Sequence, residues 1–195
     1  MAELESHNIQ KIADGVGPAY HRVYSILIPA DLPSAEHAMS ELQKNPDHFS
    51  PHLLASFEKL NGSNEELRKQ DEFQIHVTGP WNGPVKVSDV CAHSFSLATI
   101  EGHFEAGVIK FRICPQNDEQ VLFEIESLAR SRDAVVDFFY DKVPIAKLAQ
   151  TEMWSSFCQA FAKKAMGERV ENTELPEVSI ITERRSEDSG QWQKL

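Results

Sequence analysis

Apolar and polar residues alternate through the middle of the chain, from Asp71 to Arg130. Alternation in short runs is the period of half-buried antiparallel strands, and Gly, Pro, Asn and Asp separate these runs. The pattern predicts one curved antiparallel sheet of five or more strands, in which Lys110, Glu124 and His76 face outward. The apolar face of this sheet is expected to carry Phe73, Ile75, Phe95, Leu97, Ile109, Phe111, Phe123 and Ile125.

Shorter elements are expected before the sheet. Residues 19–30 are rich in Tyr, Val and Ile and close with prolines, which predicts a first strand. Ser34 is a candidate N-cap for a helix over residues 35–44. Ser50 and Pro51 indicate the start of a second helix. The apolar stripe of this second helix would consist of Leu53, Leu54, Phe57 and Leu60.

A long helix is predicted after the sheet, over residues 133–166, because apolar residues recur there at spacings of three and four. Pro144 lies inside this stretch and must kink or interrupt the helix, since an interior proline costs roughly 3 kcal/mol. Gly167 is expected to end it. The apolar side, with Trp154 and Phe157, is expected to lie across the sheet.

These elements predict a single domain over residues 1–167, with its sheet core at 71–130. Residues 1–17 are a short lead-in whose role the sequence does not indicate. Residues 168–195 are polar and charge-mixed, and they are expected to form a mostly mobile tail with one short strand-like run. The fold class is therefore α+β.

The composition of the chain limits which binding partners and cofactors are expected. The 195 residues carry a formal net charge of −11, which argues against nucleic acid and anionic membrane surfaces. The first residues lack the features of a signal peptide and no apolar run is long enough for a membrane span, so a cytoplasmic protein is expected. The three cysteines and eight histidines have no chelating spacing, so we expect neither a metal nor another cofactor. The oligomeric state stays open, with a homodimer among the alternatives.

Two motifs resemble a known family. They are the run FSLATIEGHFEAG from Phe95 to Gly107 and the run FEIESLAR from Phe123 to Arg130. Together they are similar to the bacterial and plant family called domain of unknown function nineteen-ninety. The order of elements resembles the helix-grip fold of the START, birch-pollen-allergen and polyketide-cyclase superfamily (SRPBCC). This resemblance implies a curved sheet wrapped around a C-terminal helix, with a cavity between them.

The resemblance and the apolar pattern together define a candidate ligand site. Its polar or backbone members are implied by the motifs, and its aromatic members would form apolar walls. Trp81, in a Gly- and Pro-rich turn, is a further aromatic candidate. The candidate ligand-binding residues are Phe95, Thr99, Gly102, His103, Glu105, Gly107, Phe111, Phe123, Ser127, Arg130, Trp154 and Phe157.

Each polar candidate also has a structural interpretation. Glu105 is either a functional acid or a strand-end carboxylate that pairs with Arg130 or with backbone N–H groups. His103 is either a titrating ligand contact or an exposed turn residue. Ser127 could join His103 and Glu105 in a hydrolase triad, but the sequence has no GxSxG elbow. Trp154 and Phe157 line a cavity or simply fill the core.

Three function classes follow. The first is a binding protein for a small apolar or amphipathic molecule, held between sheet and helix. The second is an enzyme of the cyclase, hydrolase or isomerase kind that uses Glu105 and His103. The third is a non-catalytic interaction protein with a filled core. The first class leads, because this architecture encloses a concave, mostly apolar space with a few polar groups at its mouth. The sequence itself identifies no reaction.

Overall fold

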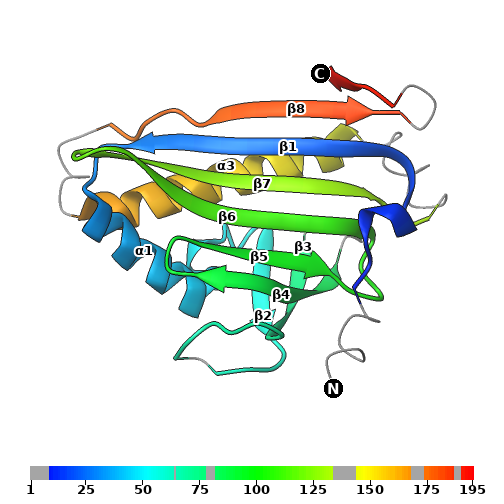
Figure 1. The fold of residues 1–195 in the computed structure, drawn as a ribbon, viewed down its shortest axis with the longest axis horizontal. Coiled ribbons are helices and arrows are strands. Elements are labelled where there is room, and N and C mark those ends of the chain that lie inside the picture. Colours follow the sequence, from blue (N-terminus) through cyan, green and yellow to red (C-terminus); the bar gives the residue numbers. More distant parts are fainter. Residues whose placement is uncertain (1–8, 64, 78–81, 134–143, 168–173, 187–189) are drawn as a thin grey trace.

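A nine-stranded antiparallel sheet forms most of the molecule (Figure 1). The computed structural model describes residues 9–63, 65–77, 82–133, 144–167, 174–186 and 190–195, and for residues 144–149 the backbone alone. In sheet order the strands are β2 (Ala55–Lys59), β3 (Glu72–Val77), β4 (Gly83–Cys91), β5 (Ser94–Thr99), β6 (Glu105–Asn117), β7 (Gln120–Ser131), β1 (Val16–Ile28), β8 (Ser179–Arg185) and β9 (Trp192–Lys194).

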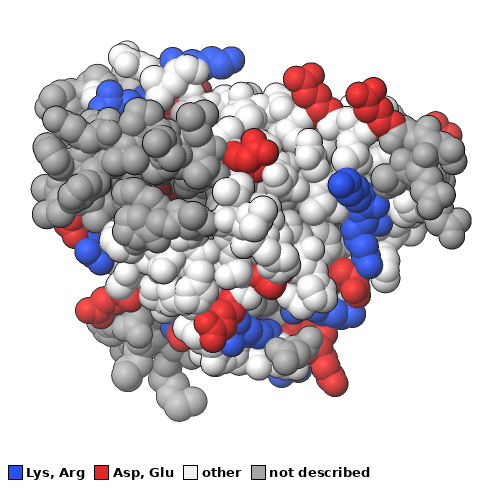
Figure 2. Space-filling view, turned by 180° about the vertical axis from the view of Figure 1, so that it is seen from behind, with Lys and Arg blue, Asp and Glu red and all other residues white. Residues whose placement is uncertain are grey.

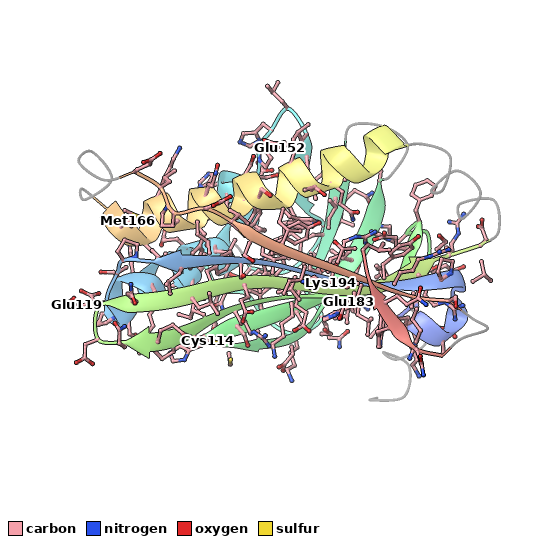
Figure 3. The ribbon with its side chains drawn as sticks, turned by 90° about the horizontal axis from the view of Figure 1, so that it is seen from above. Cys114, Glu119, Glu152, Met166, Glu183 and Lys194 are labelled. Carbon is pink, nitrogen blue, oxygen red and sulfur yellow. The ribbon has the colours of Figure 1, made fainter. Side chains whose placement is uncertain are left out.

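Helix α3 (Pro144–Met166) runs along one face of the sheet, which curves around it. Helix α1 (Leu32–Lys44) packs beside α3 on the same side. Figure 3 shows that the Met166 end of α3 lies over the β6–β7 hairpin at Glu119. We call the helix side of the sheet the concave face and the other side the convex face. The predicted α+β arrangement of sheet and C-terminal helix is confirmed.

The strand register agrees with the predicted alternation. Phe111 and Phe123 are fully buried against the helix side, and their neighbours Lys110 and Glu124 project to the convex side. Exposed His76 faces outward, as expected. A shift of one residue would have reversed every face, so this agreement fixes which side chains look toward α3.

The start of α1 lies slightly earlier than predicted. Of the predicted strand over residues 19–30, residues 19–28 lie in β1, and the following helix begins at Leu32 rather than at residue 35. Asp31 is its N-cap, and its Oδ1 accepts the backbone N–H of Ser34 at 2.9 Å. Ser34, the predicted cap, is therefore the capped residue, which leaves Pro33 in the first turn where its missing N–H does no harm.

The predicted second helix is wrong. Residues 55–59 instead form β2, which pairs with β3 and buries Ala55 and Phe57 on one face. Leu53 and Leu60, expected on the helical stripe, are 91% and 50% exposed. The apolar residues of this segment fit both a helical and a strand spacing. The segment forms a strand because it pairs with β3.

The described part of the predicted C-terminal helix is α3, which covers Pro144–Met166. Gly167 follows the last residue of α3 with φ +58°, the left-handed conformation that commonly ends a helix. Residues 134–143, the rest of the predicted helix, lie outside the described residues.

The short strand-like run expected in the polar tail, at residues 178–182, corresponds to residues 179–185 of the structure. They form β8, which pairs with β1 over seven residues, and β9 pairs with β8 in turn. On the convex face, His21 of β1 bridges Glu126 of β7 at 2.8 Å and Glu183 of β8 at 3.0 Å. Burial lowers the pKa of His21, but the hydrogen bonds to the two carboxylates outweigh it and leave the pKa raised. The last strands are thus built into the sheet.

Candidate functional site

The concave face has two dissimilar ends. The end beneath the C-terminal half of α3 is aromatic, and the end where β6 begins and β7 finishes is polar. We call the first the aromatic end, which consists of Phe95, Phe111, Phe123, Trp154, Phe157 and Phe161. We call the second the polar end, which consists of Tyr20, Arg22, Thr99, Glu105, Ser127 and Ser131.

The aromatic end is closely packed. Phe95 stacks on Phe111 with ring centroids 4.6 Å apart, and Phe123 stacks on Phe161 at 3.8 Å. Phe157 contacts Phe111 at 5.6 Å, and Trp154 completes the group from the same helix. Each of these rings is at most 5% exposed. Five of the predicted ligand residues therefore belong to the packed core, in which Phe161 contacts Phe123.

The polar end is packed less tightly. Ser127 on β7 pairs with Ile109 on β6, and both lie in the middle of their strands on the concave face. Both nevertheless remain partly exposed, whereas Phe111 and Ile125 on the next rung are completely buried. Ile109 and Ser127 are therefore less completely buried than the rung beneath the aromatic end.

Glu105 and His103 lie at the outer limit of the polar end. Glu105 pairs with Ser131, faces the concave side and is partly exposed. The His103 ring packs over Gly83, where an added Cβ would lie only 2.2 Å from the ring. Its Nδ1 accepts the backbone N–H of Glu105 at 2.9 Å. Burial lowers the pKa of His103, so its neutral form is favoured.

The N-terminal segment forms hydrogen bonds with the turn between β5 and β6. The side-chain amide of Gln10 donates to the carbonyls of His103 and Glu105 at 3.2 Å each. The backbone N–H of Gln10 donates to Thr99 at 2.8 Å. Residues 9–14 therefore hold the turn that carries His103, a role that the sequence did not indicate.

Three predicted site residues have structural roles in the backbone of the sheet. The Thr99 hydroxyl accepts the N–H of Gly107 at 2.9 Å. Gly102 has φ +101° in the turn before β6, a conformation that favours glycine. An added Cβ at Gly107 would lie 2.2 Å from the Leu128 carbonyl oxygen. Gly107 therefore admits the neighbouring strand β7, rather than making room for a guest.

Arg130 lies on the opposite side of the sheet from Glu105. It pairs with Ala106, projects to the convex face and donates from its guanidinium to the Gly17 carbonyl. There it lines a hollow of about 320 Å³ together with Ala19 and Arg185. The ion pair with Glu105 that the sequence suggested is therefore not formed, because the two side chains leave opposite faces.

The three members of the suggested triad do not converge. Ser127 lies four residues from Ser131, the partner of Glu105, which is roughly 13 Å along the strands. His103 lies beyond Glu105 in the turn. No hydrogen-bonded Ser–His–Glu arrangement is possible over that separation.

Sequence reasoning missed the most polar part of the concave face, which belongs to β1. Arg22 is 6% exposed and lies directly opposite Ser127, and Tyr20 and Tyr24 flank it on the same face. The signal was present, because these three residues continue the alternation of Ile26 and Ile28. An arginine in register with buried isoleucines indicates a cation that faces the interior.

Metal and membrane features can be judged for the described residues alone. Within them, no group of three His, Cys, Asp or Glu side chains could hold a metal ion. No helix in that part of the chain is long and apolar enough to cross a membrane. Trp81, a further aromatic candidate, lies outside the described residues.

A family model agrees with the two motifs. The model described as Domain of unknown function (DUF1990) matches residues 35–160, which is more than half of the chain. The chain belongs to the DUF1990 family. The matched region begins in α1, so the likeness to DUF1990 covers more than the sheet and the last helix. A search of the curated proteins found no match.

Solved structures show what fold this DUF1990 member has. Norcoclaurine synthase from Thalictrum flavum, in complex with dopamine and hydroxybenzaldehyde, is 13% identical with a TM-score of 0.56, over 84% of this chain and 92% of that chain. The Zhui aromatase/cyclase from Streptomyces sp. R1128 is 12% identical with a TM-score of 0.56, over 78% and 96%. The KanY protein is 18% identical with a TM-score of 0.54, over 78% and 99%. The chain thus shares the fold of these proteins, a curved antiparallel sheet with a long C-terminal helix.

Proposed function

We propose that this protein binds a small, largely apolar molecule between the polar end of the sheet and α3. One observation carries the proposal: Ile109 and Ser127 stay partly exposed although they lie in mid-strand on the concave face. A face that was packed against the helix over its whole length would bury both. A concave apolar space with a few polar groups is the usual form of a small-molecule site.

The proteins of similar fold support the same conclusion. One of them is a synthase in complex with two aromatic compounds, and another is an aromatase/cyclase. At 12–13% identity their chemistry does not transfer, but the fold is one in which small organic molecules are accommodated. In this chain the aromatic end would form one wall of the space, and Glu105 with His103 would stand near its mouth.

Catalysis has less support than binding. His103 uses Nδ1 to accept the backbone N–H of Glu105, so that nitrogen serves the turn. Ser127 is too far from either group to act with them. An acidic interaction surface also has little support, because charges of both signs are scattered over the described part of the helix side (Figure 2).

The proposal can be tested with ligands and with a variant whose larger side chain would fill the proposed binding space. A thermal-shift screen of fatty acids, isoprenoids and aromatic metabolites should give hits, since a ligand at a hundredfold excess over its Kd stabilises the folded state by about 2.7 kcal/mol. Ser127→Trp should abolish the shift and leave a folded protein, because its side chain would enter the open end. Lys110→Trp, on the convex face, is the matched control and should keep it. Hits that survive Ser127→Trp, or a screen without hits, would overturn the proposal.

A further inference from the structure

Arg22 is the least expected residue on the concave face. It is 6% exposed, projects from β1 toward the helix side and has a hydroxyl residue, Ser127, directly opposite on β7. Its guanidinium carbon lies 4.7 Å from the centroid of the Tyr20 ring, which holds the side chain along the strand. Burying a guanidinium is costly unless oxygen atoms accept its hydrogen bonds. A guanidinium has five N–H donors, so it can bond to more than one acceptor at the same time.

Tyr24, two residues further along β1, adds a second donor. Its side chain is 1% exposed, and its hydroxyl has no hydrogen-bond partner among the described residues. Burial raises its pKa, Arg22 and the nearby Thr151 hydroxyl lower it to a smaller extent, and the negative charge of Glu105 raises it slightly. Thr151 is therefore close, but it does not form a bond of normal geometry. The neutral phenol keeps its proton and can donate it.

The open part of the concave face adjoins both groups. Ser127, opposite Arg22, is partly exposed, and so is Ile109 beside it. A guest that reaches this floor meets the guanidinium of Arg22 and two hydroxyl groups on adjacent rungs. Glu105, the acidic residue of the polar end, is level with Ser131 rather than with Arg22. The nearest donors thus favour an anionic oxygen group over a cation.

We infer that the ligand is an organic acid, whose carboxylate is held by Arg22 with Tyr24 and Ser127 while its apolar body lies against the aromatic end. The inference rests on the proposed function and specifies its ligand class. A planar carboxylate matches the two parallel donors of a guanidinium, and a hydrogen bond of this charged kind contributes more than a neutral one. Burial would strengthen this charged hydrogen bond further, because little water competes with it there.

Matched pairs of probes test the charge separately from the cavity. Isothermal titration calorimetry of the full chain would compare decanoate with decanol, and 2-naphthoate with 2-naphthalenemethanol. The acid of at least one pair should bind the wild type about 10- to 100-fold more tightly than its alcohol, which is the usual worth of a hydrogen bond to a charged group. Arg22→Gln should remove this preference by weakening the acid alone.

Two further variants keep the test interpretable if Arg22→Gln fails to fold. Tyr24→Phe should leave the melting temperature nearly unchanged, because it removes a hydroxyl without a described partner, yet it should weaken the acid several-fold. Arg112→Gln removes a cation from the convex face, where Arg112 pairs with Glu124 at 2.8 Å, and should leave both affinities unchanged.

The outcomes separate the two proposals. Equal affinities for acid and alcohol in the wild type would overturn the organic-acid inference and leave the binding function standing. A preference for the acid that survives both Arg22→Gln and Tyr24→Phe would do the same. Absence of binding by all four compounds would overturn the inference as well, and the wider screen described above would then decide the binding function independently.

Discussion

The aromatic end and the polar end are made from the same strands, yet they use the space beneath α3 in opposite ways. At the aromatic end, rings from β5, β6 and β7 meet rings from α3, and none of the six is more than 5% exposed. At the polar end, Ile109 and Ser127 stay partly exposed and Arg22 and Tyr24 bring polar groups inside. Closely packed rings are thus concentrated at one end of the sheet, and partly exposed or polar side chains are concentrated at the other.

The largest effect is expected from truncating the stacked pair at the aromatic end. Phe123→Ala should lower the free energy of unfolding by about 3–5 kcal/mol, because it removes a buried ring and leaves a cavity against Phe161. Ser127→Ala, two rungs away, should change it by about 0.5 kcal/mol or less. Urea denaturation of the two variants measures both values. Similar losses in the two would contradict the division between the ends.

A smaller loss of unfolding free energy is expected when Gly107 is replaced. Glycine is required there because β7 approaches closely, and not because a ligand needs the space. Gly107→Ala should cost about 1–3 kcal/mol, because the new methyl group would lie 2.2 Å from the carbonyl oxygen of Leu128. Val108→Ala, at the next and more exposed position of β6, is the control and should cost less. If Gly107→Ala unfolds at the same urea concentration as the wild type, the close approach of β7 is not a constraint.

The smallest effect concerns pH at the mouth of the polar end. The turn leaves part of His103 accessible, but its ring packs on Gly83 and its pKa is lowered by burial. The unfolded chain then binds the proton more readily, so the stability that His103 contributes is present above its unfolded pKa, about 6.5, and is lost as the pH falls below that value. The free energy of unfolding, measured from pH 7.5 to pH 5, should show this slope in the wild type.

The control for this slope uses two variants. In His103→Gln the difference from the wild type should shrink as the pH falls, because only the wild type gains a destabilising proton. In His76→Gln, at an exposed histidine that pairs with Glu58 at 3.0 Å, this shrinkage should be absent. A wild-type advantage that grows toward pH 5 would mean that His103 is stabilised in its charged form.

Local alternation was sufficient to predict the centre of the fold. Phe111 and Phe123 fell on the buried face because a strand repeats every two residues, and this rule needs no knowledge of distant partners. It failed for β2, since Leu53, Leu54, Phe57 and Leu60 also fit a helical spacing. It indicated only part of β8, the strand-like run at residues 178–182, because a strand with much exposed surface carries little apolar signal.

The candidate site was less predictable than the fold, because its geometry depends on contacts between distant segments. The motif identified Glu105 and Ser127 on the concave face, but not their separation along the sheet. Gly107 was interpreted as ligand space, since the approach of the Leu128 carbonyl cannot be seen in a sequence. Arg22 could have been recognised, because a charge in phase with Ile26 and Ile28 breaks an apolar face.

The pairing of β8 with β1 matters for where this chain can be cut. A protein ended at Gly167 would lose β8, and the outer edge of β1 would then present unpaired N–H and C=O groups along the residues that now face β8. Open edges of that length recruit other strands, so such a fragment would be prone to self-association in expression and storage. Residues 179–185 cover this edge of β1 by pairing with its residues 19–25.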